Sequence, residues 1–120
     1  MLKDRLRLAL LDRARAAAVI TYRDLADRLE LRPPQTIHRV TQALEILMAE
    51  DVAAHRPLLA ALCVSRAQGD LPAPGFFAAA RALGIYAGDL EGPQAQAFYA
   101  DALARALEFY RQVPDETFAR

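Results

Sequence analysis

The sequence predicts a mainly α-helical domain with a small β-hairpin. Alanine supplies much of the 54% of residues that are hydrophobic, and only 5 of the 120 residues are glycine; such a composition favours helices. Apolar residues recur three and four positions apart in several segments, which is the spacing of a helix face. Proline and glycine fall between these segments, where they end helices and form turns.

The N-terminal part of the chain begins with a helix and a short extended segment. Apolar spacing predicts the helix over residues 3–18, and the β-branched residues that follow predict a brief strand over residues 19–22. A second helix is expected over residues 22–29, with Thr21 as its N-cap. The proline pair at residues 33–34 ends it, because proline supplies no backbone donor.

A third helix is expected from residue 34 or 35 to about residue 50. Four apolar residues, spaced three or four positions apart, would form its buried stripe: Ile37, Val40, Leu44 and Leu47.

The remaining part of the chain combines one ambiguous segment with two further helices. The apolar run at residues 58–64 fits either a buried strand or a helix. The turn-rich stretch at residues 67–75 resembles a wing loop. Helices are then expected at residues 76–83, ended by Gly84, and at residues 93–113.

A chain of 120 residues corresponds to one domain. The expected order of elements is that of a winged helix-turn-helix-like domain with extra C-terminal helices. We therefore expect a winged-helix-like core at residues 1–75, helices packed on it at residues 76–113, and a loose tail at residues 114–120.

Residues 20–51 point most clearly to a function, because they read as two helices joined by a proline-bearing turn. Such a unit places its second helix in the major groove of double-stranded DNA. Arginine can bind guanine through two hydrogen bonds and glutamine can bind adenine. The expected base readers are Thr36, His38, Arg39 and Gln42. The expected phosphate contacts are Arg23, Arg28 and Arg32.

The formal net charge is zero, but it is unevenly distributed. Residues 1–42 carry nine basic and five acidic side chains, a net charge of +4, so residues 43–120 carry −4. This asymmetry fits a molecule with one side facing an anionic partner. It also fits chance scatter in a sequence rich in arginine.

Three patterns together resemble a known family. They are Thr21-Tyr22-Arg23-Asp24-Leu25-Ala26, the helix start Gln35-Thr36-Ile37-His38-Arg39-Val40, and Pro57 through Val64-Ser65-Arg66 to Gly69. Residues 20–75 are thereby similar to the C-terminal module of the alkyltransferases and alkyltransferase-like proteins that repair alkylated guanine. The resemblance implies a winged-helix fold.

The resemblance does not extend to the chemistry of that family. The Pro-Cys-His-Arg motif is missing, and alignment on Gly69 places Ala61 where the family has its cysteine. Cys63 has apolar neighbours, which disfavour a thiolate. We expect Cys63 to be a buried structural residue, and the protein not to be an enzyme.

No cofactor or metal site is expected, because no nucleotide-binding loop or ligand spacing occurs. His55 follows Asp51 by one helical turn, and we expect at most a weak surface pair between them. A single cysteine and the lack of a membrane-spanning apolar run predict a cytoplasmic protein that does not enter a membrane.

Three aromatic pairs mark the C-terminal part: Phe76-Phe77, Phe98-Tyr99 and Phe109-Tyr110. On a helix, each pair would direct one ring inward and leave the other turned away. The remaining rings either pack the C-terminal helices onto the core or form a ligand pocket or dimer surface. The alternative to DNA binding is therefore a protein-interaction module, with a second copy or another protein as its partner.

Overall fold

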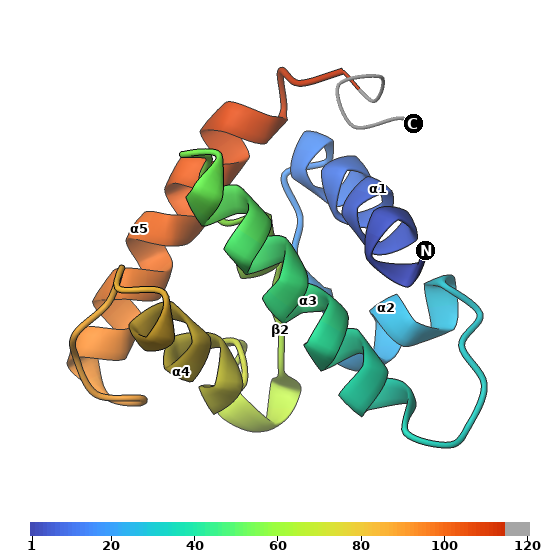
Figure 1. Cartoon of the computed structure of the whole chain (residues 1–120), viewed down its shortest axis with the longest axis horizontal. Coiled ribbons are helices and arrows are strands. Elements are labelled where there is room, and N and C mark those ends of the chain that lie inside the picture. The colour runs from blue at the N-terminus through green and yellow to red at the C-terminus, as the bar shows by residue number, and fades with distance from the viewer. Residues whose placement is uncertain (115–120) are drawn as a thin grey trace.

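Helices make up most of the structure, a computed structural model that describes residues 1–114 (Figure 1). Its α-helices are α1 (Leu2–Arg15), α2 (Tyr22–Arg28), α3 (Thr36–Ala53), α4 (Pro74–Ala82) and α5 (Pro93–Tyr110). The other elements are the strands β1 (Ile20–Thr21) and β2 (Cys63–Val64) and the 3-10 helices η1 (Leu59–Leu62) and η2 (Arg66–Gln68). The predicted mainly α-helical fold with a small β component is confirmed. Apart from Pro114, the expected tail lies outside the described residues.

The two strands pair in parallel, with Ile20 opposite Cys63. Parallel strands need a long crossover connection, and here α2, α3 and η1 provide it. The expected hairpin is reduced to one antiparallel bridge between Ser65 and Leu71, which closes the loop around η2. In that bridge the Ser65 N–H donates to the Leu71 carbonyl over 2.8 Å.

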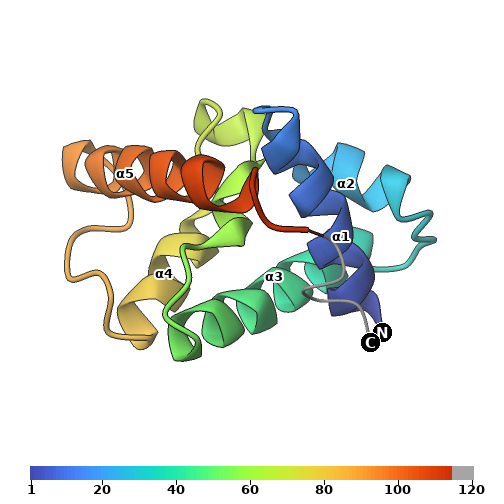
Figure 2. The same cartoon turned by 90° about the horizontal axis from the view of Figure 1, so that it is seen from above.

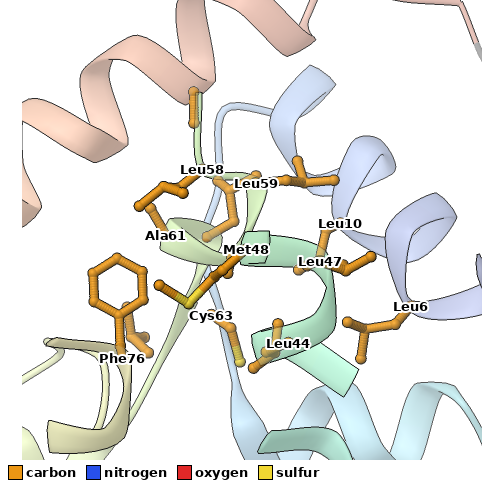
Figure 3. Close-up of a cluster of buried hydrophobic side chains, with 14 of the residues drawn as sticks. Leu6, Leu10, Leu44, Leu47, Met48, Leu58, Leu59, Ala61, Cys63 and Phe76 are labelled. Carbon is orange, nitrogen blue, oxygen red and sulfur yellow. The ribbon is translucent and has the colours of Figure 1, made fainter. Parts of the chain in front are cut away.

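The apolar run at residues 58–64 lies in the hydrophobic core and combines both expected conformations. It forms η1 and then β2, and every one of its residues is buried. Helices α1, α3 and α5 all pack against η1. Figure 3 shows Leu58, Leu59, Ala61 and Cys63 among apolar side chains from neighbouring elements. A segment covered on all sides has no polar face, so its sequence carries no spacing that distinguishes helix from strand.

Helix α3 crosses the near face of the molecule in Figure 1, with α1 and α2 on one side and α4 on the other. Val40, Leu44 and Leu47 are buried, as the stripe predicts. The expectation for Ile37 was wrong, because its side chain is 44% exposed. Ile37 lies in the first turn of α3 and lines a surface groove there.

A buried ion-pair network holds the C-terminal end of α3 against its neighbours. Asp51 is fully buried and accepts hydrogen bonds from Arg7 Nη1 (2.9 Å), Arg56 Nε (3.1 Å) and the backbone N–H of Leu59 (3.2 Å). Because Asp51 points inward while His55 is exposed, the two residues do not form a pair at the surface. Asp51 continues the buried stripe of α3, four positions after its last expected member.

Helix α5 lies on the opposite side of the molecule from α3 (Figure 2). It packs against α1 and η1, so the C-terminal helices do contact the N-terminal part of the chain. The ring of Tyr110 is fully buried, and its hydroxyl donates a hydrogen bond to the Pro57 carbonyl over 2.6 Å.

Aromatic rings cluster where α4, α5 and the segment between them meet. The cluster consists of Phe76, Phe77, Tyr86, Phe98 and Tyr99. Both Phe76 and Phe77 are buried, so the expected division into inward and outward rings was wrong for this pair. It was right for the last pair, in which Tyr110 is fully buried and Phe109 is 41% exposed.

Candidate nucleic-acid interface

The segment from α2 to α3 forms two helices joined by a turn. The Thr21 hydroxyl accepts a hydrogen bond from the Asp24 N–H over 3.1 Å and so caps α2, as predicted. Glu30 and Gln35 have positive φ angles of 56° and 60°, which turn the chain between the helices. The Arg39 N–H donates to the Gln35 carbonyl over 2.9 Å, the first backbone bond leading into α3.

Three exposed side chains follow one strip of α3: Arg39, Gln42 and Ile46. We call this strip the α3 ridge. Residues three, four and seven positions apart lie on the same side of a helix. His38 is exposed beside the ridge, and Thr36 is half-buried at the start of the helix. The structure therefore places all four expected base readers in the first two turns of α3. Ile46, which was not among the expected readers, lies on the same strip as Arg39 and Gln42.

Two glutamates of α3, Glu45 and Glu50, lie near the ridge. The Glu45 carboxylate lies beside α4, where a Cβ added to Gly75 would stand 3.8 Å from Glu45 Oε2. Glu50 pairs with Lys3 and, over 2.9 Å, with Arg7 Nη2. The hydrogen bond from Lys3 lowers the pKa of Glu50, which keeps this carboxylate ionised and paired. Glu50 is therefore paired with two cations, whereas Glu45 remains an exposed carboxylate on the side of α3 that faces α4.

The arginines expected to contact phosphate flank the turn and α2. Arg23 and Arg32 are exposed, and neither has an ion-pair partner within residues 1–114. Arg28 forms an exposed pair with Asp12. Surface pairs of this kind contribute only about 0–1 kcal/mol, so phosphate can compete for Arg28.

A groove of about 590 Å³ opens beside the first turns of α3. Its lining includes Tyr22, Arg23, Ile37, Thr41, Ser65 and Arg66. The Tyr22 hydroxyl accepts a hydrogen bond from the Ala73 N–H over 3.0 Å, which fixes the ring at one wall. Burial raises the pKa of Tyr22 above its ordinary value, so the phenol stays protonated.

Arg66 was not among the expected site residues, although η2 places it in the lining of this groove together with Arg23 of α2. It is separated from Arg23 by 43 positions in the sequence. The parallel pairing of β1 with β2 and the hydrogen bond between Tyr22 and Ala73 bring the two segments together. The one local signal was its position next to the glycine-containing loop.

The expectation for Cys63 is confirmed, because its side chain is fully buried in the core. Burial raises the pKa of its thiol above the ordinary value, so no thiolate forms near neutral pH. Ala61, at the position aligned with the family cysteine, is fully buried as well.

Among residues 1–114, no group of three or more His, Cys, Asp or Glu side chains is placed to hold a metal ion. In the same part of the chain, none of the helices has the length and apolar character needed to span a membrane.

The chain was compared with models of known protein families, with curated proteins and with solved structures, and no match was found.

Proposed function

We propose that this protein is a non-enzymatic DNA-binding protein that inserts α3 into the major groove of duplex DNA. The observation that carries the proposal is the α3 ridge, where Arg39 and Gln42 stand together and exposed on one helix face. The neighbouring carboxylates are directed to α4 or bound by Lys3 and Arg7. An exposed helix face that carries an arginine and a glutamine suits the major groove, which is about 12 Å wide and admits an α-helix.

The proposal assigns separate roles to the polar side chains around α3. Arg39 would bind guanine and Gln42 adenine, because these side chains match the paired hydrogen-bonding atoms of those bases. Thr36 and His38 would complete the reading surface. Arg23, Arg28 and Arg32 would bind phosphates and hold α2 and its turn against the DNA backbone. In this arrangement the loop around η2 takes the place of a wing, as the alkyltransferase resemblance implies.

We expect replacement of Arg39 by alanine to weaken binding to a preferred duplex by about 10- to 100-fold, because a two-bond contact to guanine contributes about 1–3 kcal/mol. The duplex would be selected from a randomised pool with the full chain, labelled, and titrated in fluorescence anisotropy at several salt concentrations. Replacement of Arg23 by glutamine should weaken all duplexes equally and reduce the slope of log K against log salt by about 0.9.

The matched control is Arg81→Gln, which removes an exposed arginine from α4. It should leave both the affinity and the salt slope unchanged. The proposal fails if the wild-type dissociation constant stays weaker than about 1 mM at low salt, since non-specific DNA binding is already tighter than that. It also fails if Arg81→Gln weakens binding as much as Arg39→Ala.

A second candidate function is protein interaction through α5. A groove of about 680 Å³ runs along its C-terminal half and is lined by Pro57, Ala104, Phe109 and Val113, among others. Exposed aromatic rings are common anchors of protein interfaces. If two copies meet here, light scattering will give a mass that rises with concentration, and Phe109→Ser will abolish that rise. A mass that stays at the monomer value at every concentration would rule out a homodimer.

A further inference from the structure

Ile46 is the apolar residue of the α3 ridge, whose other two members, Arg39 and Gln42, are polar. Its side chain is 47% exposed, more than that of any other large apolar residue in the described part of the chain except Met1. It lies four positions after Gln42 and seven after Arg39, on the same strip of α3. In Figure 1, no other helix or strand passes in front of α3. A large apolar side chain thus stands in line with two polar ones that suit base edges.

The length of the ridge matches a short run of base pairs. A helix rises 1.5 Å per residue, so Arg39 and Ile46 are separated by about 10.5 Å along the axis of α3. Base pairs in DNA are about 3.4 Å apart, so this distance spans about three base steps. A helix lying along the groove would therefore present the three ridge residues to neighbouring base pairs.

The chemistry of the groove supplies a partner for each of the three side chains. Guanine offers two acceptors to arginine, adenine an acceptor and a donor to glutamine, and thymine a 5-methyl group. That methyl group is the apolar feature of the major-groove edge. We propose that Ile46 reads thymine through its 5-methyl group, within about three base pairs of the base bound by Arg39. This inference rests on the proposed function of α3.

A protein partner suits this strip less well. Protein interfaces have an apolar centre of several residues surrounded by polar ones. On the same face as Ile46, the exposed residues are Arg39, Gln42 and the small side chains of Ala49 and Ala53, and the half-buried Glu50 is paired with Lys3 and Arg7. The other exposed isoleucine of α3, Ile37, is nine positions away and faces the groove beside α2. A single apolar side chain in line with one arginine and one glutamine matches the polar atoms and methyl groups of a major-groove edge better than it matches an apolar protein interface.

The experiment compares thymine with deoxyuridine, which differs from it only by the 5-methyl group. The full chain first selects duplexes from a randomised pool, and each thymine of the preferred duplex is then replaced in turn by deoxyuridine. At one position, wild-type binding should weaken about fourfold, the factor for losing one apolar methyl contact. Ile46→Ala should bind the thymine and deoxyuridine duplexes equally well.

The control is Ile37→Ala, which removes a similarly exposed isoleucine from the other side of the same helix. It should retain the fourfold preference for thymine. If Ile46→Ala also retains it, or if no thymine affects wild-type binding, the inference is overturned while DNA binding stands. If the chain binds no duplex at all, the proposed function fails and the inference fails with it. If Ile46→Ala changes self-association but not DNA affinity, the ridge is a protein interface.

Discussion

Replacement of Asp51 by alanine is expected to lower the free energy of unfolding by about 3–5 kcal/mol, the usual cost of removing one partner from a buried ion pair. Asp51 is fully buried, and the side chain of Arg7 is only 5% exposed. Without the carboxylate, the Arg7 guanidinium keeps its charge in the interior but loses its fully buried acidic partner, while its pair with the half-buried Glu50 stays. The backbone N–H of Leu59 loses its acceptor as well. Urea denaturation followed by circular dichroism would measure the change.

The matched control is Asp101→Ala, which removes the acidic partner of an exposed pair with Arg105 on α5, 2.8 Å apart. We expect a change of at most about 0.5 kcal/mol there, as is usual for such helix pairs. Asp51→Asn removes the charge but keeps the shape of the side chain and one acceptor oxygen. It therefore separates the contribution of the charge to stability from that of packing and hydrogen bonding. Equal effects of Asp51→Ala and Asp101→Ala would show that the buried network contributes little to stability.

Replacement of Tyr110 by alanine should also cost about 3–5 kcal/mol, the range for truncating a buried aromatic side chain. The ring is fully buried, and its hydroxyl donates to the Pro57 carbonyl over 2.6 Å. The residue therefore ties α5 to the segment that leads into η1. Tyr110→Phe removes only the hydroxyl and should cost about 1 kcal/mol, plus any penalty for leaving the carbonyl without a donor. Thermal unfolding followed by circular dichroism would rank the variants.

Phe109 provides the control, since it is the neighbouring aromatic residue but is 41% exposed. Its ring contacts that of Tyr110 edge to face at 4.9 Å, so Phe109→Ala should cost no more than about 1.5 kcal/mol. A Tyr110→Ala protein as stable as Phe109→Ala would contradict the tertiary role of α5. A separate early transition in Tyr110→Ala would show that α5 unfolds independently of the remaining helices.

Most of the helices could be predicted, because their sequences carry a clear amphipathic spacing. The expected and observed starts of α2 coincide at Tyr22, where Thr21 supplies the cap. Helix α3 ends at Ala53, three residues beyond the expected end at about residue 50, which is within the roughly two to four residues by which such boundaries vary. Asp51 lies just past the expected end. In the structure it belongs to the buried stripe and is satisfied by Arg7 and Arg56. A partner far away in the sequence leaves no local signal.

Site residues on a single helix could be predicted from the sequence. Site residues brought together from two distant segments could not. Arg39 and Gln42 share a helix face by their spacing alone. Arg66 joins Arg23 in the lining of the groove beside α2, because the pairing of β1 with β2 brings their distant segments together. Ile37 and Ile46 show that the exposure of an apolar side chain also depends on distant segments. Spacing assigned Ile37 to the core, and only the positions of the neighbouring elements leave both side chains exposed.

The sequence by itself determined the helical character, the helix-turn-helix segment and the burial of Cys63, because each depends on neighbouring residues and their local preferences. The tertiary structure decided which strands pair, which charges are buried together, and which apolar side chains of α3 remain at the surface. These features depend on contacts between segments tens of residues apart, and the free energy of such contacts is set by packing geometry that local spacing does not encode.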